Sequence, residues 1–362
     1  MSLARLFLIA LGFAVLFLPF KGISGALWMF GALAVALPAL KGLAHLASRR
    51  EVRLPSIPKI NPMVLYAAAL AVLVCVPIIA RGYVIDVLVL AAIYVILAEW
   101  LNVVVGFTGL LSLGFVAFYV IGAYTYALLT TQAGIGFCVA MPVSALVAAA
   151  AGGLLALPAL RLRGDYLALV TLGFGEIVRL VLNNWDSVTH GPNGISGIPR
   201  PALAGFSLDR LEHYYYLALV MVVISLAVIR NVRESKIGRA WVAIREDEIA
   251  ASASGINTLL FKFYANAFGA FFAGLAGVLY AAKMQFVSPE SFTFFESVIV
   301  LCMVILGGLG SITGVVLGAT LLVVLPELLR DVQAYRMLVL GAGLVALMIF
   351  RPQGIMGRRH AS

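Results

Sequence analysis

The chain has 362 residues, of which 63% are hydrophobic and 11% are charged, and its formal net charge is +9. A soluble domain carries charge on about a quarter of its residues, so most of this surface cannot face water and the composition indicates a membrane protein. The basic residues lie at the ends of apolar runs without any nucleic-acid-binding motif, and we therefore expect no nucleic-acid partner.

Apolar runs of about 20 residues, the length that crosses a bilayer as a helix, recur along the whole chain. The predicted spans are 6–20, 23–40, 63–80, 83–101, 107–130, 137–160, 165–184, 213–230, 259–282, 293–306, 312–330 and 335–350. The expected fold is all-α, a polytopic helical membrane protein with about 12 (10–12) transmembrane segments. The Gly-rich run 106–114 and the short run 293–306 either span the membrane or re-enter it.

Residues 49–62, RREVRLPSIPKINP, are basic and rich in proline, and they separate the first two runs from the others. This predicts an accessory N-terminal membrane-helix region (1–60), a membrane core (61–354) and a short tail (355–362). The first run has no convincing small-x-small cleavage site and is followed at once by further spans, so we expect it to be retained.

The basic residues are distributed unevenly between alternate loops. Most of them fall in 41–59, 161–163, 230–258 and the C-terminal tail, whereas the intervening loops hold only scattered ones. By the positive-inside rule, both termini and segment 230–258 are predicted to be cytoplasmic.

The sequence lacks recognisable motifs for ATP hydrolysis, catalysis or metal binding. No lysine follows a glycine, so the Gly-Lys-Ser/Thr phosphate loop is absent and the chain does not hydrolyse ATP by that motif. The histidines lack HExxH spacing, and no catalytic triad can be assembled, so we expect neither an enzyme nor a metal site. The three cysteines form no metal-ligand spacing and are expected to be small buried hydrophobes.

Few charges lie inside the predicted spans. Glu176 and Arg179 are three residues apart on one helical face, so they either form an ion pair or line a substrate path. Asp86, Glu99 and Glu296 lie near predicted span ends, where we expect them to be solvated at the membrane interface.

Two Gly-rich stretches, GFTGLLSLG (106–114) and GGLGSITGVVLG (307–318), have two interpretations. In the first, small residues let helix backbones approach closely. In the second, the stretches break helices and expose backbone groups to a transported solute. The candidate path residues are Gly106, Thr108, Gly109, Glu176, Arg179, Gly308, Gly310 and Ser311.

The segment GRAWVAIREDEIAASASGIN (238–257) is highly charged although it lies between apolar runs. Ser235 is expected to cap a helix here, with Trp241 and Ile244 three residues apart, and Gly255 is expected to end it in a left-handed conformation. The segment is either an interfacial linker or a helix that docks in a groove of a cytoplasmic partner.

This segment resembles the cytoplasmic signature of branched-chain amino acid ABC transporter permeases of the LivM type. The resemblance continues through LNVVVGFTGLLSLGFVAFYVIGAYTYALL (101–129), GDYLALVTLGFGEIVRLVLNN (164–184), GPNGISGIP (191–199), FVSPESFTFFESVIVLCMVILGGLGSITGVVLGA (286–319) and RPQG (351–354). Together these motifs cover nearly all of residues 83–354.

The resemblance implies a permease subunit that imports leucine, isoleucine and valine across a bacterial inner membrane. Implied partners are a second related permease, two ATPase subunits that hold ATP and Mg²⁺, and a periplasmic amino-acid-binding protein, with no cofactor on this chain. The binding protein would dock at Asn193, Gly194 and Ser196. The residues implied to couple to the ATPases are Trp241, Ile244, Arg245, Glu246, Asp247, Ala250, Ala251 and Gly255.

The coupling segment departs from the pattern of importer permeases at one position. These permeases generally carry Glu-Ala-Ala, three residues and then Gly in this loop, whereas here Ile249 occupies the Glu position and Glu248 is displaced by one. Two alternatives remain open for the whole chain: a urea or short-amide ABC permease, and an autonomous secondary carrier or channel.

Overall fold

The computed structural model describes residues 82–328 except 160, 161, 163, 204, 205 and 209, together with 71, 73–77, 80, 341 and 354–356. The chain divides into two compact units, Met1–Val72 and Leu73–Ser362, and nearly all described residues belong to the second. The predicted spans 6–20 and 23–40, most of 63–80 and almost all of 335–350 lie outside the described residues.

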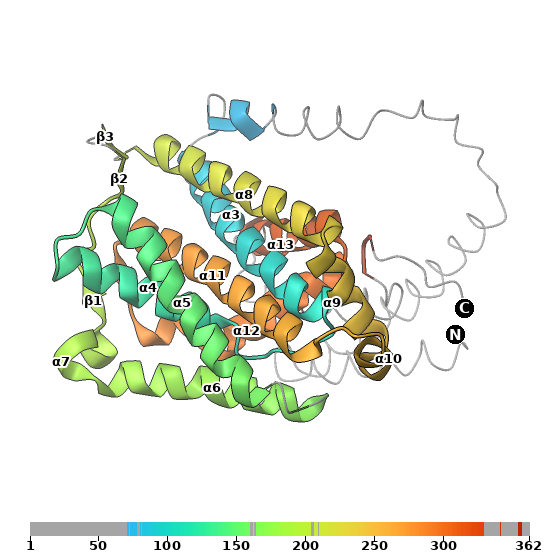
Figure 1. The fold of residues 1–362 in the computed structure, drawn as a ribbon. Helices are drawn as coiled ribbons and strands as arrows, with labels where there is room; N and C mark the ends of the chain where they lie inside the picture. Colours follow the sequence, from blue (N-terminus) through green and yellow to red (C-terminus); the bar gives the residue numbers. More distant parts are fainter. Residues whose placement is uncertain are drawn as a thin grey trace, which may run out of the picture. The chain divides into compact units, whose positions relative to one another are not determined.

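The described part is a bundle of helices with a few two-residue strands (Figure 1). Its elements are α3 (Gly82–Asn102), the π-helical turn η1 (Val103–Phe107), α4 (Val116–Thr131), α5 (Phe137–Ala159), α6 (Asp165–Asn184), α7 (Asp186–Thr189), η2 (Gly191–Asn193), β1 (Ile195–Ser196), β2 (Ala202–Leu203), β3 (Phe206–Ser207), α8 (Leu211–Glu234), α9 (Lys236–Glu246), α10 (Glu248–Ala253), α11 (Thr258–Met284), β4 (Phe286–Val287), η3 (Pro289–Phe292), α12 (Phe294–Gly307) and α13 (Ile312–Leu328).

Six helices of the described part are long and apolar enough to cross a membrane. They are Gly82–Phe107, Phe137–Ala156, Tyr166–Asn184, Leu211–Glu234, Thr258–Met284 and Pro289–Gly307, and the shorter apolar helices are Val116–Thr131 and Ile312–Glu327. The prediction of a mostly helical membrane protein is therefore confirmed. The count of about 12 spans includes segments outside the described residues and stays a prediction.

The span predicted over 107–130 does not begin at residue 107, because the Gly-rich run after α3 is not helical over its whole length. The helix leaves α geometry at η1 and stops at Phe107, and α4 begins only at Val116. Gly109 has φ +73°, a left-handed conformation that ends helices and that residues with a side chain resist. Run 293–306, in contrast, forms the helix α12, which η3 extends to a 19-residue apolar segment.

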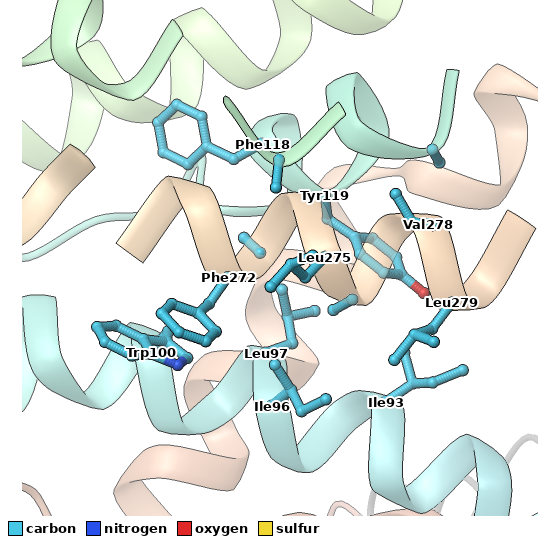
Figure 2. Close-up of a cluster of buried hydrophobic side chains, with 14 of the residues drawn as sticks. Ile93, Ile96, Leu97, Trp100, Phe118, Tyr119, Phe272, Leu275, Val278 and Leu279 are labelled. Carbon is cyan, nitrogen blue, oxygen red and sulfur yellow. The ribbon is translucent and has the colours of Figure 1, made fainter. Parts of the chain in front are cut away.

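Helices α3, α4 and α11 build the centre of the bundle, and Figure 2 shows the buried side chains that they contribute. The ring of Trp100 on α3 stacks on Phe272 of α11, with centroids 4.1 Å apart. Its Nε1 donates a 2.8 Å hydrogen bond to Ser225 Oγ on α8. A buried indole N–H needs such a partner, so this contact fixes α8 against the core.

None of the three cysteines is buried as expected: Cys75 and Cys138 are exposed, and Cys302 is intermediate. Cys138 lies on α5, a helix that also presents large apolar side chains such as Leu146 and Leu154 outward. Periodicity does not distinguish an outward apolar face from a core face when the surrounding solvent is itself apolar.

Helices α4 and α11 approach each other closely through glycines. A Cβ on Gly122 would lie 2.4 Å from both the Cα and the carbonyl oxygen of Gly274, and one on Gly277 would lie 2.0 Å from the Tyr119 carbonyl oxygen. The backbones are therefore in direct contact at these positions, which small residues allow in membrane helices.

We predict that Gly122→Ala destabilises the protein by about 1–3 kcal/mol, because the added methyl group forces the two backbones apart. Gly173→Ala is the matched control, since a Cβ at this helical position of α6 would meet nothing within 4 Å. Thermal unfolding of the purified protein in detergent measures both variants. Equal midpoints for the two alanine variants would contradict the close contact.

Candidate functional site

The charged segment forms two short helices, α9 and α10, which lie at the end of the bundle opposite the strands (Figure 1). Both helices are capped by side chains. Ser235 Oγ accepts hydrogen bonds from the backbone N–H groups of Ile237 and Gly238, at 3.1 and 3.4 Å. Asp247 Oδ1 accepts from Ile249 and Ala250 at 2.8 and 3.1 Å. Asp247 therefore starts a second helix where the sequence suggested a single one.

Gly255 ends this pair of helices as expected from the sequence. It has φ +83°, and the N–H of Ile256 bonds to the Ala251 carbonyl at 3.1 Å. This is the left-handed termination that glycine favours. The chain then enters α11, whose start is capped by Asn257 Oδ1 bonded to the Leu260 N–H at 3.1 Å.

The apolar side chains that we expected to contact a partner face this chain instead. Trp241 and Ile244 are 0% and 4% exposed, and Ala251 is 4% exposed. Trp241 Nε1 donates to the Phe261 carbonyl of α11 at 2.8 Å. Their apolar surface holds α9 and α10 on the bundle, while their expected role in coupling to a partner stays a prediction.

Other residues of the segment remain accessible. Val242 is 44% and Ile249 is 69% exposed, and Arg245, Glu246, Asp247, Ala250 and Gly255 are also exposed. Ile249, which stands at the position where importer permeases usually carry Glu, is thus the most exposed large apolar side chain of the segment. The exposed apolar side chains of Val242 and Ile249 are therefore the ones in this segment that a partner could contact.

Glu248 gains a role that the sequence left open. Its Oε1 lies 2.6 Å from Nζ of Lys262 on α11, and the Lys262 side chain is only 3% exposed. A buried ammonium group needs such a counter-charge, so the pair ties α10 to α11. Sequence reasoning missed Lys262, although a single lysine inside the apolar run 259–282 was a signal for a specific partner.

The two Gly-rich stretches, which are about 200 residues apart in the sequence, meet at Arg245. Nη1 of Arg245 donates a 2.5 Å hydrogen bond to the carbonyl of Gly106 in η1. The N–H of Gly310 donates to Asn102 Oδ1 at the end of α3, at 2.8 Å. A Cβ on Gly109 would lie 3.3 Å from Cγ of Arg245. We call Asn102, Gly106, Gly109, Arg245 and Gly310 the glycine junction.

No side chain fits at the centre of the glycine junction. A Cβ on Gly106 would lie 2.1 Å from Asn102 Oδ1 and 2.6 Å from the Gly310 nitrogen. Gly310 has φ +80°, and a Cβ there would lie 3.2 Å from Arg245 Nη1. Gly106 and Gly310 therefore use their backbone groups for contacts within the protein, which favours the packing interpretation of these glycines.

The end of α12 is closed by a segment from far along the chain. The N–H groups of Ile355 and Met356 donate to the carbonyls of Leu306 and Gly307, at 2.8 and 3.1 Å. Gly308 has φ +108°, and a Cβ on Gly354 would lie 2.5 Å from its Cα. The last carbonyls of a helix need partners, and residues 354–356 supply them.

Two polar residues of the Gly-rich stretches, Thr108 and Ser311, bond locally. Thr108 Oγ1 donates to the Val104 carbonyl at 2.5 Å, and Ser311 Oγ accepts from the Gly314 N–H at 3.2 Å. These bonds stabilise the end of η1 and the start of α13. Both residues thus close helix ends beside the glycine junction.

Glu99 is another polar group in this region, and it is buried rather than solvated as we expected. It is 0% exposed, and neither carboxylate oxygen has a hydrogen-bond partner in the described part of the chain. The expectation failed because α3 and η1 continue the helix to Phe107, so Glu99 is not at its end. Ionisable groups inside a membrane bundle mark functional regions, and Glu99 lies one turn before Asn102.

Asp86 and Glu296 also have protein partners. Asp86 forms a 3.1 Å ion pair with Lys283, and Glu296 Oε2 accepts a 2.7 Å hydrogen bond from the Tyr94 hydroxyl. The Asp86 side chain is 52% exposed, which agrees with an interfacial position, whereas Glu296 is half-buried between α3 and α12.

Glu176 and Arg179 lie apart from the glycine junction, on α6. They form the expected ion pair, with 2.9 Å between Arg179 Nη2 and Glu176 Oε2, and their side chains are 33% and 29% exposed. Glu176 also lines a shallow pocket with residues of α4 and with Thr293, Phe294 and Ser297 around the start of α12. The structure thus supports the ion pair and leaves a path role for this pocket as a proposal.

The loop after α6 carries the candidate docking residues. β1 pairs antiparallel with β4, with Ile195 opposite Val287. Gly194 is buried with φ +66°, and a Cβ there would lie 2.1 Å from the Val287 carbonyl oxygen. Asn193 and Ser196 on either side are exposed. The loop is therefore fixed to the segment after α11. Its backbone conformation is held by this pairing, and it exposes the polar side chains of Asn193 and Ser196.

The fold and this geometry define a class: a polytopic helical membrane protein in which a charged pair of helices is anchored to the ends of membrane helices. Residues 83–348 match the family model described as branched-chain amino acid transport system / permease component, and the chain belongs to this family of transport permeases.

Curated relatives agree with the family. The chain is 50% identical over 301 residues to the high-affinity branched-chain amino acid transport system permease protein LivM of Escherichia coli K12, which covers 77% of this chain and 71% of that protein. The same values hold for LivM of Salmonella typhimurium LT2. The chain is also 27% identical over 190 residues to LivH of E. coli K12. This alignment covers 49% of this chain and 61% of that protein. No solved structure matches this chain.

Proposed function

We propose that this chain is the membrane-spanning permease subunit of an ABC importer that carries leucine, isoleucine and valine across the bacterial inner membrane. The observation that carries the proposal is the anchored pair of helices α9 and α10, which presents Ile249 on a chain of the permease family. The 50% identity to two proteins named for high-affinity branched-chain amino acid transport supports the substrate class.

The energy for import would come from separate subunits. The sequence lacks the Gly-Lys-Ser/Thr loop that holds nucleotide phosphates, so ATP and Mg²⁺ would be bound by two partner ATPases. A second related permease would complete the membrane part, because E. coli and S. typhimurium each have both a LivM and a LivH permease that are similar to this chain.

Two surfaces serve these partners in the proposal. Exposed Val242, Ile249 and Ala250 would enter a cleft of an ATPase subunit, a helix-in-groove contact with charged residues at its rim. Asn193 and Ser196 would contact a periplasmic amino-acid-binding protein, with Gly194 holding the turn between them. The pocket beside Glu176 would lie along the solute path.

The proposed topology has 10–12 spans, with residues 1–60 as an accessory region and both termini in the cytoplasm. Its support is the excess of basic residues in 41–59, 161–163, 230–258 and the C-terminal tail. Because α9 and α10 lie at the opposite end of the bundle from the strands, this orientation puts the loop with Asn193 outside.

Cysteine labelling tests this orientation. After Cys75, Cys138 and Cys302 are replaced by serine, Ser196→Cys should react with a membrane-impermeant thiol reagent from outside the cell. Asp247→Cys should react only after the membrane is permeabilised, since both positions are exposed but at opposite ends of the bundle. The reverse labelling pattern would refute the orientation.

The transport function is tested by reconstitution of the chain with its second permease, ATPases and binding protein in proteoliposomes. We expect leucine uptake to require ATP and to persist when the proton gradient is collapsed, because the energy enters through the ATPases. Leucine uptake by this chain alone without ATP would establish a carrier or channel instead. Uptake of urea or acetamide in place of leucine would overturn the proposed substrate.

Ile249→Glu should weaken recovery of the ATPase subunits with the purified permease by at least about tenfold, because a charge replaces an apolar contact at the centre of the proposed interface. Ile249→Val is the matched control and should retain the ATPases. Thermal unfolding of the permease alone should be the same for all three proteins, since Ile249 is 69% exposed. Normal recovery with Ile249→Glu would remove this residue from the interface. Glu at Ala251 is unsuitable for this test, because that side chain is buried.

A further inference from the structure

Arg245 connects two parts of the molecule that the sequence places far apart. It lies in the last turn of α9, and it donates to a carbonyl of η1, 139 residues earlier in the chain. The other exposed arginine of α9, Arg239, bonds to the Glu234 carbonyl at the end of α8, five residues away. Within α9, Arg239 therefore contacts the neighbouring helix in the sequence, whereas Arg245 contacts the distant end of the α3–η1 helix.

The groups that Arg245 reaches are the ends of two helices. The Gly106 carbonyl belongs to the last turn of the continuous helix α3–η1, where backbone acceptors lack partners within the helix and favour a cation. Gly310 follows the end of α12, and its N–H is held by Asn102 Oδ1 of α3. One guanidinium group thus lies against both helix ends, 2.5 Å from the Gly106 oxygen.

The glycine junction also lacks room to absorb a movement locally. Any side chain at Gly106 would overlap Asn102 and Gly310, and Gly307 and Gly314 are in similarly close contact on the other side of the break between α12 and α13. Close-packed backbones transmit a displacement as a shift of whole elements, because they have no side chains that could change rotamer and take it up.

α9 is itself fixed to the bundle at its apolar face. Trp241 bonds to the start of α11, and Arg233 at the end of α8 lies over the Phe107 ring of η1, 5.7 Å from its centroid. A push on α9 would therefore reach α11 through Trp241 and the ends of α3 and α12 through Arg245. In the second route, Arg245 supplies the hydrogen bond that joins α9 to η1.

We infer that Arg245 is the positioning residue that transmits movement of the α9–α10 pair to the ends of α3 and α12 through the glycine junction. The inference rests on the proposed function, because it assigns the source of that movement to the partner ATPases. Asn102, Gly106 and Gly310 then act as the receiving surface, and their close contact is needed for coupling rather than for binding of a solute.

The test compares the number of leucine molecules taken up per ATP hydrolysed by the reconstituted importer. Arg245→Met keeps the apolar stem but removes the donor, and we expect uptake per ATP to fall by about tenfold, the effect of losing a hydrogen bond from a charged group. ATPase subunits should still co-purify, and ATP hydrolysis should continue. Arg245→Lys, which keeps a charged donor, should restore part of the ratio, and Arg239→Met should match the wild type.

A second variant approaches the glycine junction from α3. Gly106→Ala leaves Arg245 intact but separates Asn102 from Gly310, and it should lower the same ratio without loss of the ATPases. An unchanged ratio in both Arg245→Met and Gly106→Ala would overturn the inference. So would loss of the ATPases from Arg245→Met, because Arg245 would then be an interface residue. A wild-type complex without ATP-driven leucine uptake would overturn the proposed function itself, and with it this inference.

Discussion

The structure depends on one constraint: a helix that ends inside a tightly packed bundle must find partners for its last carbonyl groups. α3 and α12 both end near the glycine junction. The Gly106 carbonyl is bonded by Arg245, and the Leu306 and Gly307 carbonyls are bonded by Ile355 and Met356. Segments from three distant parts of the sequence are thereby brought to the same end of the bundle, and the charged helix pair becomes attached to the membrane helices.

Much of the helical architecture could be predicted from the sequence, because the bilayer sets the length of a span and apolar runs show it directly. The predicted run 165–184 agrees with α6 to within a residue, and Ser235 and Gly255 act as the expected start and end of the charged segment. These features are local. A cap or a left-handed glycine acts within a few residues, so its signal is present in the adjacent sequence.

The contacts of the candidate site could not be predicted from the sequence, because they join residues that are far apart in the chain. Trp241 and Ile244 correctly marked an apolar face, but spacing does not say whether that face meets a partner or the same chain, and here it meets α11. Likewise, neither the contact of Arg245 with Gly106 nor the pair of Glu248 and Lys262 has a local signal that identifies its partner. The π-helical turn η1 shifted the end of α3 and so changed the environment of Glu99.

The double capping of α9 and α10 has a further consequence for recognition. Ile249 stands in the first turn of α10, whose backbone is fixed by the Asp247 cap, by the ion pair to Lys262 and by the packed Ala251. An exposed side chain on a backbone that is already ordered loses little conformational entropy when it is bound. Affinity for a cleft of matching shape is then set by burial of the isoleucine itself, and a modest apolar surface is sufficient for specific association.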